Sequence, residues 1–432
     1  MDYQQSRAYV SDADRYAGGA LDLTNIKELM KRLGNPQDQL KYVHVAGTNG
    51  KGSVIAYLYT TLSEAGYRVG RYISPSVYSY REKMEVAGRS VSREQFAGYV
   101  TRVAAAIEEM TSEGLAHPTP FEIETAVAFL FFAEENCDLV ILEVGMGGNL
   151  DATNIIKNTI LAVLVPISMD HQSFLGNTLS EIAEKKAGII KPGCSVVTAG
   201  QQPETMAVIK NVCAQNNADL TEADLREAKA VKEDFAGQIL EYRGETFELS
   251  LAGSYQTENA ALALEALHVL EKKGYPTTVL QRKKGLKDTR WNGRLTIIHR
   301  DPLFIVDGAH NPAAADMLED SVRKYFKGRK LFFIMEVFRD KDSYYIIRKL
   351  CPYAQQIVTV ETPDNPRALP AGELAEAIKP CNPHVQAANS IEDAVNKVFD
   401  MAGCDDVILS FGSLSFIGQI TAIVKTREEK NS

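Results

Sequence analysis

Short runs of apolar residues alternate along the chain with longer segments in which apolar and polar residues recur at helical spacing. Strands of a parallel sheet read as continuous apolar runs, and the helices between them are amphipathic. This rhythm predicts an α/β fold with a mostly parallel sheet. The strands predicted in the first part of the chain are Tyr42–Ala46, Arg68–Ile73, Leu139–Val144, Leu161–Ile167 and Ser195–Thr198. The predicted helices are Ser53–Glu64, Arg93–Glu109, Phe121–Glu134, Leu179–Lys186 and Glu204–Asn216.

The alternation pauses after about residue 228. Residues 238–243 and 245–250 alternate like the two strands of an antiparallel hairpin that turns at Gly244, and a helix is predicted over Gln256–Lys272. A second α/β series follows the polar stretch 281–294. Its predicted strands are Leu295–His299, Leu303–Val306, Leu331–Val337, Gln356–Val360 and Val407–Ser410. We therefore predict a domain over residues 1–295 and a smaller α/β domain over residues 296–432.

The composition of the 432 residues is that of a globular protein, with 45% hydrophobic and 24% charged residues. A formal net charge of −9 argues against a broad basic surface for nucleic acid. The six cysteines form no Cys-x-x-Cys pair, which favours free thiols in a reducing compartment. No secretory signal pattern opens the chain, and the longest apolar run, 126–133, is much shorter than the ~20 residues of a membrane span. These features predict a cytoplasmic protein that binds neither nucleic acid nor membrane.

The strongest local motif runs from Gly47 to Ser53, directly after a predicted strand and at the start of a helix. Glycines let the backbone approach an anion closely, and a helix N-terminus points free N–H groups at it. Lys51 supplies a charge for the outer phosphates of a nucleotide and Ser53 a hydroxyl for Mg²⁺. The alternative is a purely structural turn. Gly52 stands between the lysine and the serine, unlike in the commonest phosphate loops.

Two further strand ends carry polar side chains. Glu143 ends the apolar run 139–144 beside a cluster of three glycines, and His171 follows the run 161–167. In an open α/β sheet, ligands bind beyond the carboxyl ends of the strands. Both side chains are therefore candidate metal ligands near the phosphate loop, although a histidine at such a place is commonly structural. Lys185 and Lys186, on the next predicted helix, would ordinarily be a solvated pair.

The second series has a site of its own. Its strand 303–306 leads into Asp307 and His310, and Pro312 suits the first turn of a helix. Arg294, in the polar stretch before that series, can fork onto a phosphate from either domain. An Asp/His pair in a turn is equally common as a structural feature.

Taken in order, these segments resemble the folylpolyglutamate synthase and dihydrofolate synthase family of the Mur ligase superfamily. The segments that carry the resemblance are 47–53, Ser74-Pro75, 143–154, Asp170-His171, 184–193, 291–295, 307–312 and 411–418. The resemblance implies an N-terminal P-loop ATPase domain, a C-terminal Rossmann-like domain and a cleft between them. It also implies a monomeric, ATP-dependent ligase that adds L-glutamate to a folate or to dihydropteroate through an acyl phosphate.

The same resemblance implies roles for individual residues. ATP would bind to Gly47, Thr48, Asn49, Gly50, Lys51, Gly52 and Ser53, and also to Asn259, Arg294, Asp307 and His310. One Mg²⁺ would be held by Ser53, Ser74 and Glu143, and a second by His171 and Lys186. Lys186 would be carbamylated, which turns a cation into an anionic ligand. Lys51, Lys186, Asp307 and His310 would be the catalytic set, and K⁺ is a further candidate cation.

The folate side is implied less completely. Phe121, Asp151 and Ala152 match part of a pterin pocket, and Ser413 matches a position near the incoming glutamate. The family often has His-Leu after the Ser-Pro pair and Arg after the Gly-Gly pair, where this chain has Ser76-Val77 and Asn149. Two alternatives remain open: a Mur-type ligase for a cell-wall acceptor, and a nucleotide-dependent switch without ligase chemistry.

Overall fold

The apolar runs of the first half of the chain form one eight-stranded sheet in the computed structural model, which describes residues 1–15, 22–235, 237–363 and 365–431. Its strand order is β4-β3-β2-β5-β1-β6-β7-β8, and the six strands from β2 to β8 in that order are parallel. The strands are β1 (Tyr42–Ala46), β2 (Val69–Tyr72), β3 (Met84–Val86), β4 (Arg89–Ser90), β5 (Leu139–Glu143), β6 (Thr159–Leu164), β7 (Ser195–Thr198) and β8 (Asp219–Glu222).

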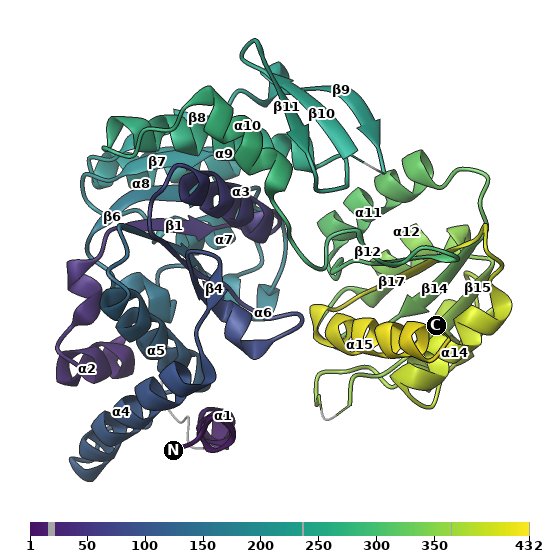
Figure 1. Ribbon diagram of the computed structural model, residues 1–432, viewed down its shortest axis with the longest axis horizontal. Coiled ribbons are helices and arrows are strands. Elements are labelled where there is room, and N and C mark those ends of the chain that lie inside the picture. Colours follow the sequence, from purple (N-terminus) through teal and green to yellow (C-terminus); the bar gives the residue numbers. More distant parts are fainter. Residues whose placement is uncertain (16–21, 236, 364, 432) are drawn as a thin grey trace.

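Helices cover both faces of this sheet (Figure 1). They are α1 (Tyr3–Asp12), α2 (Thr24–Arg32), α3 (Lys51–Glu64), α4 (Arg93–Ser112), α5 (Pro120–Glu134), α6 (Gln172–Leu175), α7 (Leu179–Ala187), α8 (Pro203–Gln215) and α9 (Gln256–Lys272). Because side chains alternate along a strand, Val43 and Val45 pack with α3 and α9, whereas Tyr42 packs with α4 and α5. Both faces are buried, which explains why the strands read as unbroken apolar runs.

The predicted hairpin is part of a three-stranded sheet in the order β11-β10-β9. The strands are β9 (Lys229–Asp234), β10 (Gly237–Tyr242) and β11 (Glu245–Leu249), followed by α9 and α10 (Val279–Asp288). Helix α10 includes the first part of the polar stretch 281–294. Gly285 lets it pack closely on α3, since a Cβ there would lie 2.6 Å from the Cα of Thr61. A contact of this kind leaves no signal in the hydropathy of the sequence.

The second half of the chain forms a six-stranded sheet in the order β12-β13-β17-β14-β15-β16, parallel except for β12. The strands are β12 (Thr296–His299), β13 (Leu303–Val306), β14 (Leu331–Met335), β15 (Gln356–Thr359), β16 (Val385–Ala387) and β17 (Val407–Phe411). The helices are α11 (Pro312–Tyr325), α12 (Ser343–Leu350), α13 (Ala371–Ile378), α14 (Ile391–Met401) and α15 (Leu414–Asn431). Helices α11 to α13 pack on one face of this sheet, and α14 and α15 on the other.

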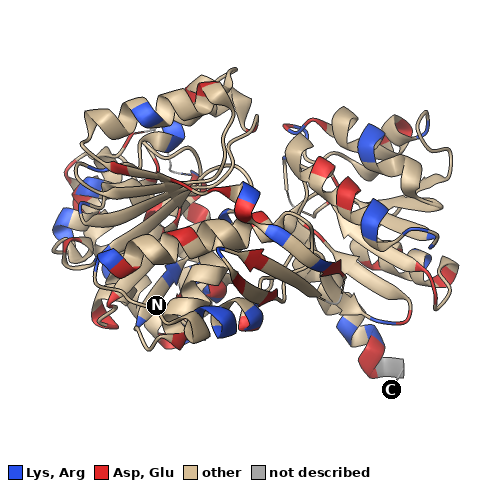
Figure 2. Cartoon of the chain, turned by 90° about the horizontal axis from the view of Figure 1, so that it is seen from above, with Lys and Arg blue, Asp and Glu red and all other residues tan. Residues whose placement is uncertain are grey.

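The predicted α/β class and the mostly parallel sheets are confirmed, with small differences at element ends. The strand predicted over 161–167 is β6 and ends at Leu164, two residues before Pro166, which has no N–H to donate to a sheet. The division at residue 295 falls between α10 and β12 and stays a prediction. Acidic and basic residues are interspersed on both halves (Figure 2). No helix in the described part of the chain is long and apolar enough to span a membrane.

Candidate active site

The phosphate loop joins β1 to α3 at the carboxyl end of the first sheet. Gly47 and Gly50 have φ of 142° and 97°, a region that favours glycine. A side chain at Gly47 would also collide with Val165, because a Cβ would lie 2.7 Å from the Val165 carbonyl oxygen. Thr48 fixes the loop to the next strand end, where its hydroxyl donates to the Ser168 carbonyl at 3.1 Å and accepts from the Ser168 N–H at 3.0 Å.

The Lys51 side chain folds back over the phosphate loop. Its Nζ donates to the carbonyl oxygens of Thr48 and Gly47 at 3.3 and 3.4 Å and lies 4.0 Å from Glu143 Oε1. Burial raises the pKa of the Glu143 carboxyl, and the Lys51 ammonium opposes that shift. The other carboxylate oxygen accepts from the Ser74 N–H at 3.2 Å. The structure thus brings together Lys51, Ser74 and Glu143, three residues that the sequence placed at the first metal and the phosphates.

Ser53 lies in the first turn of α3 and is only 2% exposed. Its hydroxyl accepts a hydrogen bond from Gln256 Nε2 at 3.2 Å, and Asn259 Nδ2 donates to Gln256 Oε1 at 3.1 Å. Asn259 also adjoins Gly50, since a Cβ at Gly50 would lie 2.5 Å from Asn259 Oδ1. The first turn of α9 therefore supports the phosphate loop from behind. Gln256 was not singled out in the sequence, because a glutamine in an amphipathic helix carries no distinguishing signal.

Lys186 enters the same site from α7, and its side chain is buried. Its Nζ donates to the Gly47 carbonyl at 2.8 Å. Burial, together with the charge of Lys51, lowers the pKa of Lys186 to about 7. Lys185 differs: its Nζ donates to the Phe174 carbonyl at 2.6 Å in an exposed position. The geometry thus separates two adjacent lysines that the residue pattern alone could not.

The glycines after Glu143 explain how α7 comes so close. A Cβ at Gly148 would lie 2.7 Å from the Lys185 carbonyl oxygen and 2.8 Å from that of Lys186. The Asn149 N–H donates to the Lys185 carbonyl at 2.9 Å. The glycine cluster therefore holds the end of α7, and with it Lys186, against the phosphate loop.

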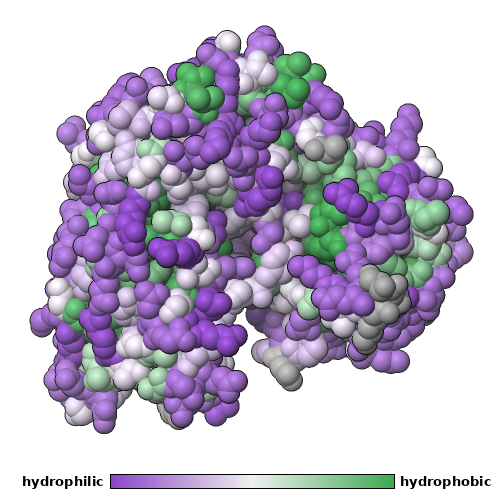
Figure 3. All heavy atoms as spheres, in the orientation of Figure 1, coloured by the Kyte–Doolittle hydropathy of each residue, from purple (hydrophilic) through white to green (hydrophobic). Residues whose placement is uncertain are grey.

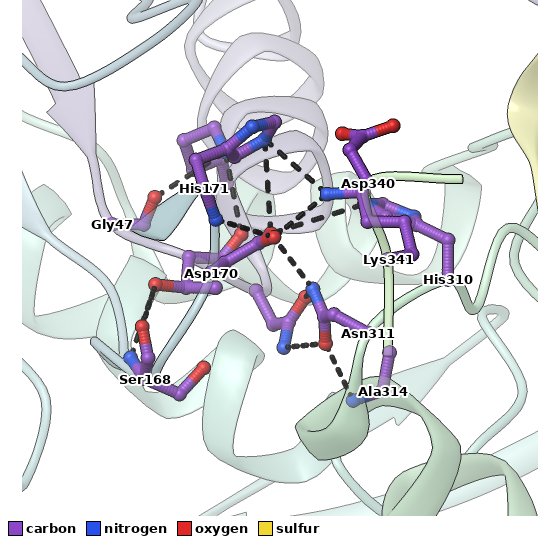
Figure 4. A network of polar contacts seen from close by, with 12 residues as sticks. Gly47, Ser168, Asp170, His171, His310, Asn311, Ala314, Asp340 and Lys341 are labelled. Atoms are coloured by element: carbon purple, nitrogen blue, oxygen red, sulfur yellow. Dashed lines mark hydrogen bonds and ion pairs between the residues drawn. The ribbon is translucent and has the colours of Figure 1, made fainter. Parts of the chain in front are cut away.

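The C-terminal half closes over this site through a network of polar contacts (Figure 4). Asn49 and Asn311 exchange two amide hydrogen bonds of 3.1 and 3.2 Å, and Asn311 Nδ2 also donates to Asp170 Oδ2 at 3.1 Å. Lys341 Nζ donates to Asp170 Oδ1 at 2.7 Å. Burial disfavours the charged carboxylate, but Lys341 outweighs burial and holds the pKa of Asp170 below its ordinary value.

Both predicted histidines adjoin this network. His171, with φ of 49°, places its Nε2 3.8 Å from Asp170 Oδ2, and His310 Nε2 lies 4.0 Å from the same oxygen. Burial lowers the pKa of His171 and lowers that of His310 to about 4. Both imidazoles are therefore neutral at pH 7, so each has a ring nitrogen that can accept a hydrogen bond or bind a metal.

A cavity lies between the two halves, in the hollow seen in the space-filling view (Figure 3). Its lining includes Asn49, Gly50, Ser53, Asn259, Arg294, Asp307 and His310, all predicted to contact ATP. Asp307 accepts from the N–H groups of Leu295 and Ala309 at 2.9 and 2.8 Å, and burial raises its pKa. Arg294 adjoins Gly308, where a Cβ would lie 2.3 Å from the Arg294 Nη1. The structure brings these residues from both halves to the walls of one cavity.

The residues matched to a pterin pocket gather around Gly145, two positions after Glu143. Phe121 stacks on Tyr72 with ring centroids 6.1 Å apart, and Phe121 and Asp151 both adjoin Gly145. The Asp151 carboxylate accepts from the N–H groups of Met146 and Thr153 and from the Thr153 hydroxyl, and Ala152 is 5% exposed. The structure brings these residues together, and it also gives Asp151 a structural role as the cap of a short helix.

Ser413 stands apart from the phosphate loop, at the carboxyl end of β17. Its hydroxyl is 2.6 Å from that of Ser415, accepts from the Ser415 N–H at 3.1 Å and lies beside the buried Glu336 carboxyl. These partners all belong to the C-terminal half. The predicted role of Ser413 near glutamate stays a prediction.

Lys341 was missed in the sequence, although a signal existed. Residues 340–342, Asp-Lys-Asp, follow the carboxyl end of β14 at a short distance, the same kind of position that singled out Glu143 and Asp307. The sequence pattern indicates Asn311 only as part of the turn over residues 307–312. Its side chain caps α11 by accepting from the Ala314 N–H, and it reaches Asn49 as well.

Comparison with known proteins agrees with this arrangement. Residues 45–267 match the Mur ligase middle domain, and residues 293–414 match the Mur ligase glutamate ligase domain. The dihydrofolate synthase/folylpolyglutamate synthase of Bacillus subtilis is 34% identical over 431 residues, which cover 98% of this chain and 99% of that protein.

Solved structures agree with the sequence comparison. The folylpolyglutamate synthase of Mycobacterium tuberculosis complexed with ADP superposes with a TM-score of 0.88 at 30% identity, covering 98% of this chain and 99% of that one. E. coli FolC in complex with DHPP and ADP has a TM-score of 0.85 at 27% identity, covering 98% of each chain. The chain therefore belongs to the dihydrofolate synthase/folylpolyglutamate synthase family of Mur ligases.

Proposed function

We propose that this protein is an ATP-dependent ligase that joins L-glutamate to a folate or to dihydropteroate. One observation carries the proposal: Lys51, Lys186, Arg294 and His310 converge from both halves on the cavity and loop that suit a nucleoside triphosphate. The names of the relatives supply the substrate class, because those proteins are dihydrofolate or folylpolyglutamate synthases.

A free carboxylate is a poor acyl donor, so the reaction needs activation. In the proposed first step, a carboxylate oxygen of the acceptor attacks the γ-phosphorus of ATP; the bond to the β–γ bridging oxygen breaks, giving an acyl phosphate and ADP. The phosphate loop N–H groups and Lys51 bind the triphosphate, and Arg294 neutralises charge from the opposite wall. The contacts between Asn49, Asn311 and Asp170 hold the two walls together.

In the second step, the amine of glutamate attacks the acyl carbon, and the tetrahedral intermediate expels phosphate to leave an amide. The amine attacks in its neutral form, and the proton that it then loses leaves with the phosphate. The imidazole of His310, whose pKa burial lowers to about 4, is neutral and can hydrogen-bond in the cavity. The closed cavity keeps water away from the acyl phosphate. Water would otherwise hydrolyse it to the starting carboxylate and phosphate.

The residues present fit two Mg²⁺ sites of the kind that rely on nucleotide oxygens. Among the described residues no group of three or more His, Cys, Asp and Glu side chains could hold a metal, so a closed protein cage is not built. Mg²⁺ commonly takes only one or two protein carboxylates and completes its shell with phosphates and water. Ser53, Ser74 and Glu143 would hold the first ion, and His171 and Lys186 the second. The ions would neutralise the charge of the transferring phosphoryl group.

Lys186 can serve as a ligand only if its amine carries no proton. Its lowered pKa, about 7, leaves a substantial neutral fraction at physiological pH, and a neutral amine reacts with CO₂ to form a carbamate. A carbamate supplies the anionic oxygens that a bare lysine lacks. Carbamylation of Lys186 is therefore part of the proposal, as are a role for K⁺, a monomeric state and a cytoplasmic location.

The test is ADP release by the purified chain with Mg²⁺, K⁺, ATP and L-glutamate, comparing dihydropteroate, tetrahydrofolate, a UDP-muramyl acceptor and no acceptor. We expect release only when both glutamate and one of the two pterin acceptors are present. Release with the muramyl acceptor but with neither pterin acceptor would contradict the folate assignment. Slow release independent of any acceptor would identify a nucleotide switch.

The Lys51→Ala variant tests the phosphate loop in the same assay. Loss of one preorganised cation should lower the rate on the order of 10²-fold or more. The matched control is Lys157→Ala, which removes an exposed surface lysine paired with Asp38. Near-normal turnover of Lys51→Ala would remove Lys51 from the catalytic set.

A further inference from the structure

Lys341 is a buried cation that the reaction described above does not use. Its side chain is only 5% exposed, and it extends from the loop after β14 across the cleft to Asp170 in the other half, as the close-up shows (Figure 4). Its Nζ lies 2.7 Å from Asp170 Oδ1 and 3.5 Å from His171 Nε2. The ammonium therefore lies directly in front of the ring nitrogen that would bind the second metal.

The two cations cannot share this place. A metal on His171 Nε2 would lie about 2 Å from that nitrogen, inside the space that the ammonium of Lys341 faces. Lys341 and a divalent ion would then repel each other strongly in a buried setting, where water screens charge poorly. In the metal-free protein, by contrast, Lys341 is stabilising at this position. Its ammonium places a positive charge beside the buried Asp170 carboxylate, which is only 10% exposed and would otherwise lack a cationic partner.

We infer that Lys341 is a positioning residue that occupies the cation position at His171 until a divalent metal displaces it. The inference rests on the proposed function only in taking His171 as a metal ligand. In the metal-free protein, Lys341 pairs with Asp170 and stabilises the contact between the two halves. When the metal binds, Lys341 leaves, and its loop, residues 337–342, is released from the N-terminal half. Metal binding is thereby coupled to the contact between the halves.

The coupling is specific to Lys341 in the part of the chain that the structure describes. Asp170 is contacted from the C-terminal half by three side chains, those of Asn311, His310 and Lys341. Asn311 is neutral and His310 is held neutral by burial, which lowers its pKa, so neither repels a metal as an ammonium does. Lys341 alone of the three both stabilises the metal-free site and opposes the metal.

The experiment measures Mn²⁺ binding to the full chain by electron paramagnetic resonance, with a non-hydrolysable ATP analogue present because nucleotide oxygens complete the metal shell. The variants are Lys341→Met, His171→Ala and the double variant. The control is Lys349→Met, which removes a partly exposed lysine from α12 that pairs with Asp316 and Glu319. We expect Lys341→Met to bind Mn²⁺ about tenfold more tightly than the wild type or better. The gain should disappear in the double variant, and Lys349→Met should bind like the wild type.

A second measurement, under the same conditions, reads its main effect in the unmodified protein and uses His171→Ala only as a control. Adding Mn²⁺ should speed amide hydrogen exchange in residues 337–342, and His171→Ala should abolish that effect. Equal Mn²⁺ affinity of Lys341→Met and wild type, a gain that survives in the double variant, or unchanged exchange would overturn the inference. The ligase assay is read separately. Its failure with a positive Mn²⁺ result rejects the proposed reaction and leaves the role of Lys341 standing.

Discussion

At the scale of the residue, two adjacent lysines show how strongly burial changes the chemistry of a side chain. Lys185 and Lys186 share one helix and one chemistry, yet the Lys185 ammonium stays in an exposed position while Lys186 reaches the Gly47 carbonyl in a buried one. Burying an ammonium favours its neutral form, which is why the pKa of Lys186 falls to about 7. The proposed carbamylation of Lys186 rests on that burial.

Substituting the two lysines separately tests this distinction. Lys186→Ala should lower the rate of acceptor-dependent ADP release on the order of 10²-fold or more, because a proposed ligand of the second metal ion is lost. Lys185→Ala, the matched control, should change it by less than about twofold, as expected of an exposed side chain away from the chemistry. Equal effects of the two substitutions would contradict the assignment of Lys186.

The pKa of Lys186 also predicts a dependence on pH. Because the neutral amine forms the carbamate, the carbamylated fraction should rise as pH increases through about 7 at constant dissolved CO₂. Carbon-13 NMR with labelled bicarbonate should show a carbamate signal that grows between about pH 6 and 8 and is absent from Lys186→Ala. A signal that is independent of pH, or that persists without Lys186, would rule this out.

At the scale of the element, the phosphate loop is held from outside by the segment after α10. A Cβ at Gly52 would lie 2.3 to 2.7 Å from atoms of the Trp291 indole, so helix α3 can pack on this ring only with glycine there. Trp291 is the single tryptophan of the chain. Its fluorescence therefore reports on the contact between the loop and the segment that leads to the second half.

Gly52→Ala should disturb this contact. Overpacking should destabilise the protein by about 1–3 kcal/mol and shift Trp291 emission. The control is Gly98→Ala in α4, where an added methyl group would meet no atom beyond the local helix backbone within 4 Å and alanine should stabilise the helix by about 0.5–1 kcal/mol. Urea unfolding followed by tryptophan fluorescence measures both. A Gly52→Ala variant as stable as Gly98→Ala would show that Trp291 moves away at no cost.

At the scale of the whole molecule, several separate contacts between described residues join the halves. One is the polar network around Asp170, and another is the packing of Val77 against the core of the C-terminal half. A further one lies beyond the cavity, where Phe235 packs on Tyr325 and Phe326 of the C-terminal half with ring centroids 5.9 and 5.3 Å apart. Glu233 accepts a hydrogen bond from the Tyr325 hydroxyl at 3.0 Å in the same region. Since the nucleotide cavity has walls from both halves, its shape depends on these contacts.

Phe235→Ala should therefore weaken nucleotide binding from a distance. Loss of two aromatic contacts, each worth about 0.5–1.5 kcal/mol beyond buried area, loosens the placement of α11 and the wall that carries His310. Isothermal titration calorimetry should show a several-fold loss of ADP affinity. Tyr344→Ala, which removes a ring that is 69% exposed, is the control and should bind ADP normally. Unchanged affinity in Phe235→Ala would mean that the Phe235 contact does not influence the shape of the cavity.

The sequence by itself determined the class of fold and most of the residues around the cavity. Strands buried on both faces must be apolar throughout, so β1, β5 and β6 were visible as runs, and polar residues at their carboxyl ends marked Glu143 and His171. The glycines of the phosphate loop were visible because few other residues adopt their backbone conformations. These signals are local: each needs only a few neighbours along the chain.

Only the tertiary structure decided which distant residues meet. Asn49 and Asn311 are 262 positions apart and Asp170 and Lys341 are 171 apart, so no local pattern can pair them. Helix α10 was hidden because its packing uses a glycine and a single buried leucine rather than an apolar face. The choice between Lys185 and Lys186 likewise depends on burial, which is a property of the packed chain. Contacts across the cleft are set by the folding of both halves, and they decide how the site works.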